Sequence, residues 1–538
     1  MVSMNSQQQE AVYSNSDRIL VLAGAGTGKT FVMINRIKRL VDEGVDPPSI
    51  LALTFTNAAA FEMGERFRRL QEFDSCISIP EFRTFHSFCY SLIAKDRDIR
   101  KHLGYLQVPS IIDEPTMKRI QSEVKHSCKI KLSDKLISDP SNLNPKQQYE
   151  YDLYYKALDR RIKQDSVITF DMLAKFVCNL FIEDNPIVQK YVDRYKYIFI
   201  DEFQDTDPLQ WSFAKCFKDS SIFIVGDALQ SIYGFRNADS SIIKSLAYDK
   251  DWTVIKLFEN YRSTEEIVAT ANHNSRYAED KYRVSLHAQT SGPPVQFKQD
   301  LRCDRRSPYP DSIKSQVASF CTEHDGTSAI LLRTNAEVSE IDNYLTDNKI
   351  DHSLGKPNTD AIHILNGVTD SSYLINWCAT HLNSDNYIDF LRIESIESKE
   401  EDTAVDRLNR FINHFGNNAK IAEYMNKAFK IREILLSKEL TQLKCHDILE
   451  LLDIKDVIVD TDAGNPVEIL GYLKSVVTQK KDSELYVGTI HSSKGLEYNN
   501  VVLLGVDGPS FRLSNEENKN LYYVGITRAR TNLMVIKA

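Results

Sequence analysis

The sequence predicts an α/β protein with two domains, each built on a parallel sheet and each carrying a mainly helical insertion. Short apolar segments alternate with helical patterns along the 538 residues, which is typical of parallel sheets that helices cover on both faces. The apolar segments fall into two groups, within 1–258 and 259–538. A long stretch without strong strand patterns interrupts each group, at about 90–192 and about 358–480.

Nine runs of apolar residues are the predicted strands, and polar or turn-forming residues bound them. In chain order they cover residues 19–23, 50–55, 197–200, 222–226, 253–258, 328–332, 484–490, 501–506 and 533–537. Helical patterns lie between them, for example at 31–41 and 58–70. The predicted first domain comprises 1–89 and 193–258 around an insertion at 90–192, and the second comprises 259–357 and 481–538 around a short insertion at 358–480.

Composition limits the classes of protein to which the chain can belong. Hydrophobic residues make up 42% of the sequence and charged residues 26%, as in globular, soluble proteins. No apolar run reaches membrane-spanning length, and the polar beginning MVSMNSQQQE has no signal-peptide core. The nine cysteines form no CxxC pair, which argues against a zinc ribbon and favours a reducing compartment. We therefore expect a cytoplasmic protein without a membrane partner.

Charge is distributed unevenly along the chain. The net charge is −9, whereas residues 101–163 contain 12 Lys/Arg and 8 Asp/Glu. A local basic excess is typical of a nucleic-acid footprint, but a solvated helical face has the same composition. The aromatic segment 150–155, EYDLYY, lies in this stretch. It either contacts DNA or forms a buried helical face, and the sequence leaves both alternatives open.

Residues 23–30, AGAGTGKT, follow the first predicted strand and precede a helix. They match the phosphate-binding pattern G-x-x-x-x-G-K-[ST], except that alanine replaces the first glycine. The glycines let backbone N–H groups approach phosphates at a helix N-terminus, where the helix dipole favours anions. Lys29 would reach the β- and γ-phosphates, and the Thr30 hydroxyl would bind Mg²⁺. The predicted loop consists of Ala23, Gly24, Ala25, Gly26, Thr27, Gly28, Lys29 and Thr30.

Two adjacent acids follow another predicted strand. The run YIFI at 197–200 leads directly into Asp201 and Glu202. In an ATP-hydrolysing P-loop site one acid holds Mg²⁺ and the other positions the attacking water. Asp201 is the predicted metal ligand together with Thr30, and Glu202 is the predicted catalytic residue. With Lys29 they predict a P-loop protein that uses ATP and Mg²⁺, a class that includes kinases, GTPases and motors.

Seven ordered segments resemble the motifs of the UvrD/Rep-type superfamily 1 DNA helicases. They are TFTNAAAFEM at 54–63, TFHSF at 84–88, DEFQDT at 201–206, VGDALQSIYGFRNAD at 225–239, LFENYRS at 257–263, VGTIHSSKGLEY at 487–498 and LYYVGITRAR at 521–530. NSQQQEAV at 5–12 resembles the Q motif of the same family. The resemblance spans nearly the whole chain and is weakest over 91–165 and 358–480. It implies two RecA-like P-loop domains with an ATP site between them.

The resemblance implies roles for residues of both domains in the ATP site. The implied catalytic residues are Glu202, Asp201, Lys29, Gln230, Arg262 and Arg528. The two arginines resemble arginine fingers, which stabilise charge on the γ-phosphate. Glu497 would help to hold the nucleotide, Gln8 would read the adenine, and Tyr261 would stack on it. Phe31 stands where the family often has arginine on the other side of the base, and it either stacks on adenine or belongs to the core.

The resemblance also implies a track for single-stranded DNA. Phe55, Tyr233 and Phe235 match positions at which the family stacks or pockets bases, and Phe235 replaces the usual tryptophan. The polar residues of the track are Thr56, Asn57, Thr84, His86, Arg236, Thr489, His491 and Ser493. A capping or core hydrogen bond is the alternative for the backbone-contacting positions among them. Ala58 and Asn237 depart from the family pattern, which affects the predicted DNA path.

The resemblance implies an ATP- and Mg²⁺-dependent motor that moves 3′ to 5′ along single-stranded DNA and unwinds tailed duplex DNA. One alternative is a DNA-stimulated ATPase that acts as a sensor or motor subunit without unwinding unaided. Another is an anti-recombinase that removes protein from DNA. We expect no nuclease domain, and size and plan are also similar to compact UvrD-like subunits of Gabija-type antiphage systems. A separate nuclease, or another repair or defence protein, is therefore a candidate partner.

Overall fold

The computed structural model describes residues 4–70, 79–112, 114–138, 140–141, 143–234, 238–299, 309–354 and 484–537, with short pieces between 364 and 473. The chain divides into two compact units. Unit 1 comprises Met1–Phe85, Leu180–Lys356 and Lys480–Ala538, and unit 2 comprises His86–Asn179 and Pro357–Gln479.

The first sheet of unit 1 has six parallel strands among the described residues, in the order β3-β2-β6-β7-β1-β8. The strands are β1 (Arg18–Ala23), β2 (Ile50–Thr54), β3 (Glu81–Thr84), β6 (Tyr197–Ile200), β7 (Ser221–Gly226) and β8 (Thr253–Leu257). In β1, Ile19 and Val21 belong to one core cluster, and the intervening Leu20 is equally buried. Burial of both faces explains why the central strands are continuous apolar runs.

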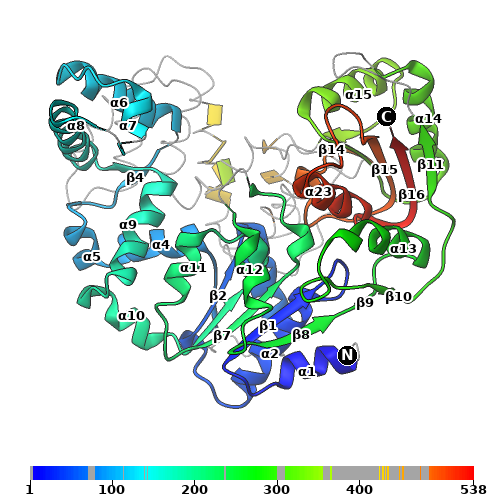
Figure 1. Ribbon diagram of the computed structural model, residues 1–538, viewed down its shortest axis with the longest axis horizontal. Helices are drawn as coiled ribbons and strands as arrows, with labels where there is room; N and C mark the ends of the chain where they lie inside the picture. Colours follow the sequence, from blue (N-terminus) through cyan, green and yellow to red (C-terminus); the bar gives the residue numbers. More distant parts are fainter. Residues whose placement is uncertain are drawn as a thin grey trace. The chain divides into compact units, whose positions relative to one another are not determined.

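Helices pack against this sheet, and α1 and α2 lie together beside β8 and β7 (Figure 1). The helices are α1 (Ser6–Tyr13), α2 (Lys29–Asp42), α3 (Asn57–Leu70), α10 (Gln189–Arg194), α11 (Pro208–Ala214) and α12 (Ser240–Leu246). Helix α2 buries Val32, Met33, Ile37 and Leu40 in the same cluster as β1. This helical spacing of apolar residues fixes α2 on the sheet, and therefore fixes the loop that joins β1 to α2.

The second sheet of unit 1 also has six parallel strands in the part of the chain that is described, in the order β11-β16-β15-β12-β14-β13. Its strands are β11 (Gln296–Gln299), β12 (Ser328–Leu332), β13 (Ser353–Leu354), β14 (Leu485–Thr489), β15 (Tyr498–Val506) and β16 (Ala529–Lys537). The helices α14 (Asp311–Glu323) and α15 (Asn335–Asp347) pack on β12, while α13 (Glu265–Asn274) and α23 (Glu516–Ile526) contact β16. A short parallel pair, β9 (Glu259–Asn260) and β10 (His287–Ala288), precedes this sheet in the chain.

The described part of unit 2 is mainly helical. It contains most of α4 (Phe85–Lys95) and α9 (Phe170–Ile182), and all of α5 (Arg97–His102), α6 (Glu114–Ser127), α7 (Asp134–Ser138) and α8 (Pro145–Gln164). Two short strands, β4 (Ser110–Ile111) and β5 (Val167–Ile168), pair in parallel. Most of the insertion predicted at 358–480 lies outside the described residues.

The predicted fold class, α/β with parallel sheets, is confirmed. All nine predicted strands are present, with ends that differ by a few residues. The strands that the sequence did not predict include β3, β11 and β13, which lie at the edges of the two large sheets. An edge strand is partly solvated, so it does not need a continuous apolar run. The β11 sequence QFKQ, for example, has three exposed residues out of four.

Candidate functional site

The loop between β1 and α2 has the backbone that phosphate binding requires. Gly26 and Gly28 adopt positive φ values of 71° and 86°, which glycine tolerates best. The Thr27 hydroxyl donates to the Gly24 carbonyl at 2.8 Å, and the buried Gln8 amide donates to the Thr27 carbonyl at 3.1 Å. The loop is therefore held from both sides, and no described side chain caps the α2 N-terminus that follows it. Uncapped N–H groups at a helix N-terminus favour an anion.

Lys29, the first residue of α2, meets the two acids that follow β6. The Lys29 ammonium lies 3.3 Å from a carboxylate oxygen of Glu202. Asp201 accepts a hydrogen bond of 2.9 Å from the Glu202 amide. Burial, and then the nearby Glu202 charge, raise the pKa of Asp201. Burial opposes ionisation of Glu202 as well, but Lys29 and Lys494 outweigh it and lower the pKa of Glu202.

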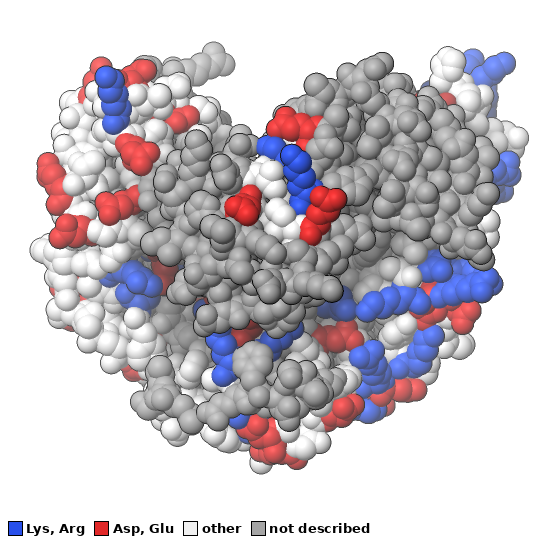
Figure 2. All heavy atoms as spheres, turned by 180° about the vertical axis from the view of Figure 1, so that it is seen from behind, with Lys and Arg blue, Asp and Glu red and all other residues white. Residues whose placement is uncertain are grey.

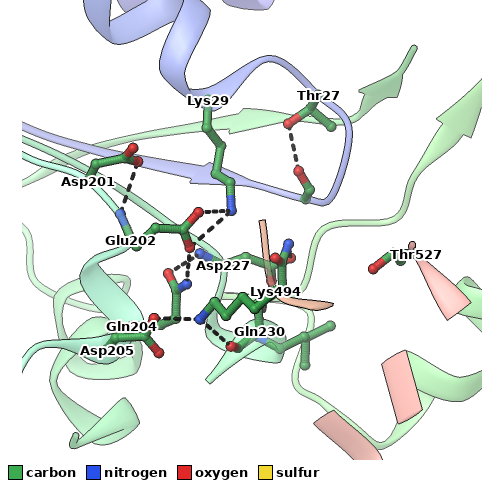
Figure 3. A network of polar contacts seen from close by, with 12 residues as sticks. Thr27, Lys29, Asp201, Glu202, Gln204, Asp205, Asp227, Gln230, Lys494 and Thr527 are labelled. Atoms are coloured by element: carbon green, nitrogen blue, oxygen red, sulfur yellow. Dashed lines mark hydrogen bonds and ion pairs between the residues drawn. The ribbon is translucent and has the colours of Figure 1, made fainter. Parts of the chain in front are cut away.

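A polar network extends from Glu202 to the end of β7 (Figure 3). The Gln204 amide donates to Glu202, and its oxygen accepts from the Asp227 amide at 2.9 Å. Asp227 in turn accepts from the Gln230 side chain at 2.8 Å. Gln204 and Asp227 are buried, so the network holds Glu202 and Gln230 in fixed positions. The sequence prediction included Gln230 but missed Gln204 and Asp227, although both lie within the quoted motifs.

The segment after β8 is joined directly to the phosphate loop. The Tyr261 amide donates to the Gly26 carbonyl at 3.0 Å, and the Asn260 side chain donates to the Ala25 carbonyl at 2.7 Å. A Cβ atom on Gly26 would lie 2.7 Å from the Cβ of Arg262. This close approach brings Arg262, predicted from the LFENYRS motif, next to the loop that carries Lys29.

Arg528 is a buried cation held by neutral groups. Its side chain donates to the carbonyls of Val524 and Leu496, each at 3.0 Å, and to the Thr527 hydroxyl at 3.3 Å. No carboxylate forms an ion pair with Arg528 within the described part of the chain. Burial, and then repulsion by Arg262, lower its pKa to about 9. A desolvated cation that has no ion-pair partner among the described residues favours an incoming anion.

Glu497 contacts Arg262 in this structure. It forms ion pairs with Arg262 and Arg530, and Arg262 also donates to the Thr527 carbonyl at 3.1 Å. Although burial opposes ionisation, the two arginines hold the pKa of Glu497 below its ordinary value. Glu497 therefore fixes the side chain of Arg262.

The three residues predicted at the adenine are Gln8, Phe31 and Tyr261, and two of them are linked through the start of α1. Tyr261 has 55% of its surface exposed, and its hydroxyl accepts from the Asn5 side chain at 2.8 Å. Asn5 is the N-cap of α1 and forms a capping box with Gln8. Tyr261 and Gln8 are thus linked through Asn5. Phe31 is half-buried and packs against the core of the first sheet, so part of its ring serves the core.

Two aromatic residues of the predicted DNA track are stacked on each other. The rings of Phe55 and Tyr233 have centroids 5.1 Å apart at an interplanar angle of 15°. Phe55 is exposed, and the Tyr233 hydroxyl donates to the His491 carbonyl at 3.5 Å. The two motifs therefore meet at one stacking platform, which is the kind of surface that binds single-stranded DNA.

The polar residues of the predicted track differ in their surroundings. Thr56 is exposed, and its hydroxyl accepts from the Ala59 amide at 3.1 Å. Thr489 accepts from the Ser492 amide at 3.2 Å. Thr84 is buried, and Ser493 is fully buried and donates to the Ile490 carbonyl at 2.8 Å. The structure thus places Ser493 in the interior, in a local hydrogen bond that does not face solvent.

Four other predicted DNA contacts lie outside the described residues or side chains, or in unit 2. Phe235 and Arg236, and the departure at Asn237, lie outside the described residues, as do the side chains of Asn57 and Ala58. His86 belongs to unit 2, where its ring lies edge-on to Phe170 at 5.7 Å.

The aromatic segment 150–155 lies on α8. Tyr154 is buried, as the helical-face alternative requires, whereas Leu153 and Tyr155 are exposed.

On the face of the molecule that Figure 2 shows, Lys and Arg side chains are interspersed with Asp and Glu among the described residues. Charge on this visible surface is therefore mixed.

Thr30 and Asp201 offer a hydroxyl and a carboxylate, the oxygen donors that Mg²⁺ prefers. Thr30 is the second residue of α2, and Asp201 directly follows β6. The donor chemistry and the neighbouring phosphate loop fit a metal bound together with nucleotide.

Among the described helices, none is long and apolar enough to cross a membrane.

Comparison with known proteins agrees with the site. Residues 4–251 match the UvrD/REP helicase N-terminal domain, and residues 371–538 match the UvrD-like helicase C-terminal domain. The chain is 27% identical to the ATP-dependent DNA helicase PcrA of Staphylococcus epidermidis, over 100% of this chain and 83% of the relative. It is 26% identical to the PcrA of Staphylococcus aureus, over 99% of this chain and 83% of the relative. The chain belongs to the UvrD/Rep-type superfamily 1 DNA helicases, a family of ATP-dependent enzymes.

Proposed function

We propose that this protein is an ATP- and Mg²⁺-dependent motor that moves 3′ to 5′ along single-stranded DNA and unwinds tailed duplexes. One observation carries the proposal. Lys29 and Glu202 from the first half of the chain, and Arg262 and Arg528 from the second half, belong to the same compact unit, and Arg262 lies against the phosphate loop. If nucleotide binding is to draw the two halves of the chain together, residues from both halves must contact the nucleotide.

In the proposed hydrolysis step, each side chain of the site has a different role. Lys29 exchanges its contact with Glu202 for the β- and γ-phosphates, which releases Glu202 to orient the attacking water. Thr30 and Asp201 would hold Mg²⁺, which would supply neutralisation of the charge on the phosphates. Arg262 and Arg528 stabilise the transferring phosphoryl group from the other half of the chain, and Gln230 joins these catalytic residues.

We also propose roles for the residues that surround this step. Glu497 orients Arg262, and the linked Gln8 and Tyr261 hold the adenine, with Phe31 beside them. Phe55 and Tyr233 form the platform for the bases of single-stranded DNA, with Thr56, Thr489 and His491 next to it. The domain boundaries that we propose are those predicted from the sequence, with RecA-like domains at 1–89 with 193–258 and at 259–357 with 481–538.

The deciding experiment is strand displacement on duplexes with a 3′ or a 5′ single-stranded tail, measured beside DNA-stimulated ATP hydrolysis. We expect displacement only of the 3′-tailed duplex, and only with both ATP and Mg²⁺. Preference for the 5′ tail would contradict the proposed polarity. Strong DNA-stimulated hydrolysis without displacement of either duplex would favour the sensor or motor-subunit alternative.

A protein partner is a separate proposal, motivated by the size and plan of the chain. Mass photometry of the chain purified together with its native neighbours tests it. A complex containing a nuclease would support a defence or repair assembly, whereas a persistent monomer would contradict it.

A further inference from the structure

Lys494 belongs to the motif VGTIHSSKGLEY, but the family resemblance assigned it no role. It follows the short helical turn His491–Ser493, and 9% of its side chain is exposed. Its ammonium group forms an ion pair with Asp205 and donates to the Gln230 carbonyl at 2.9 Å. The two residues of the ion pair are 289 positions apart in the chain. Lys494 therefore ties the second half of the chain to the DEFQDT motif of the first half.

On one side Lys494 touches the aromatic platform. Its ammonium lies 5.0 Å from the centroid of the Tyr233 ring, a cation–π distance. Tyr233 is the ring that stacks on Phe55. A base that inserts at this platform must move at least one of the two rings, because their present stacking leaves no space for it. Such a movement changes the surface on which the ammonium rests.

On its other side Lys494 touches the hydrolytic network (Figure 3). The side chain of Asp205 is almost completely buried, and one of its oxygens has no hydrogen-bond partner among the residues that the structure describes. Lys494 is therefore the cation that balances a carboxylate inside the protein. The charge of Lys494 also acts on Glu202, which shares a segment with Asp205 and is held by Gln204.

We propose that Lys494 is a positioning residue that couples the Phe55–Tyr233 platform to Glu202, so that binding of single-stranded DNA accelerates hydrolysis. The inference rests on the proposed function and deepens it. DNA that displaces the ring stack shifts Lys494, and Lys494 carries the shift through Asp205 and Gln230 to the residues that orient water. The coupling element is one ammonium group that contacts both an aromatic ring and a buried carboxylate.

The test is the ratio of ATP turnover at saturating oligo(dT) to turnover without DNA. Lys494→Met keeps much of the side-chain volume and removes the charge. We expect this ratio to fall about five-fold or more, the lower end of typical coupling between two sites, with the fall in kcat and not in the KM for ATP. Asp205→Asn should lower the ratio to a similar extent. The double variant should lose no more than either single variant, because both break one connection.

Lys244→Met is the matched control. Lys244 forms an ion pair with Glu516 between the same two halves of the chain, but it touches a different tyrosine, Tyr282. The control should keep the wild-type ratio. An unchanged ratio in Lys494→Met, an equal loss in Lys244→Met, or losses that multiply in the double variant would each overturn the inference.

The outcomes also separate this inference from the proposed function. A wild-type protein whose turnover does not respond to DNA would contradict the proposed function itself. Stimulation of the wild type that persists in Lys494→Met contradicts only the coupling role. If Lys494→Met does not fold, as judged by circular dichroism, Asp205→Asn carries the same prediction.

Discussion

The Lys29 ammonium lies 3.3 Å from the carboxylate of Glu202. The proposed water-positioning acid and the proposed phosphate-binding lysine thus neutralise each other in this structure. Both side chains are largely buried, so either charge left alone would carry a desolvation cost. We infer that nucleotide binding exchanges one partner of Lys29 for another, and that Glu202 becomes available to water only when phosphate occupies the loop.

The first prediction concerns Lys29→Ala. We expect hydrolysis to fall by roughly 10²-fold or more, the loss seen when a preorganised group that stabilises transition-state charge is removed. Binding of single-stranded DNA should persist, because Lys29 does not contact the aromatic platform. Turnover of ATP and fluorescence anisotropy with oligo(dT) measure the two properties.

Lys38→Ala is the control for that variant. Lys38 lies on the same helix and pairs with Asp42 at 2.5 Å on the surface, so its removal should leave turnover near wild type. Full turnover in Lys29→Ala would show that the phosphate loop has been assigned wrongly.

The second prediction concerns Arg262→Ala. An arginine finger typically contributes about 10³–10⁵ in rate, so turnover should fall far more than affinity for ATP. Arg530→Ala is the matched control, because it removes the other arginine that pairs with Glu497. Stopped-flow binding and steady-state hydrolysis distinguish the effects. Equal losses of binding and turnover in Arg262→Ala would contradict a finger role.

The third prediction concerns Gly26→Ala. The positive φ costs an alanine about 1–2 kcal/mol, and the new Cβ would lie 2.7 Å from the Cβ of Arg262 and 2.8 Å from the Asn260 side chain. Gly44→Ala isolates the backbone cost, because Gly44 has a φ of 94° and no atom of the described residues lies within 4 Å of a Cβ built there. We expect both variants to lower the melting temperature, and only Gly26→Ala to lose ATP affinity. Similar ATP affinities in the two variants would contradict the close contact between the loop and Arg262.

The fourth prediction concerns Tyr233→Ala. Stacking contributes about 1–3 kcal/mol per base, so affinity for single-stranded DNA should fall roughly five-fold to 150-fold. Tyr248→Ala is the control, because Tyr248 is an exposed tyrosine that contacts Glu279. Anisotropy with oligo(dT) at fixed salt gives both affinities. A wild-type affinity in Tyr233→Ala would remove the stacking role from this platform.

Local sequence predicted the parts of the fold that are buried on all sides. The segment YIFI was recognisable because β6 lies between other strands of the first sheet and is largely buried on both faces. The strands β3 and β11 were missed because an edge position leaves half of each strand in solvent, where polar residues such as those of QFKQ are tolerated. The phosphate loop was recognisable because its backbone geometry demands glycines at fixed spacing.

The sequence by itself determined the central strands, the phosphate loop, the acid pair and the order of the family motifs, because each depends on neighbours in the chain. Only the tertiary structure decided which distant groups meet. It joined Asn260 to the carbonyl of Ala25, and paired Lys494 with Asp205 across 289 positions. These contacts arise when segments that are distant in the chain pack together, and no periodicity in the chain encodes which side chains then touch.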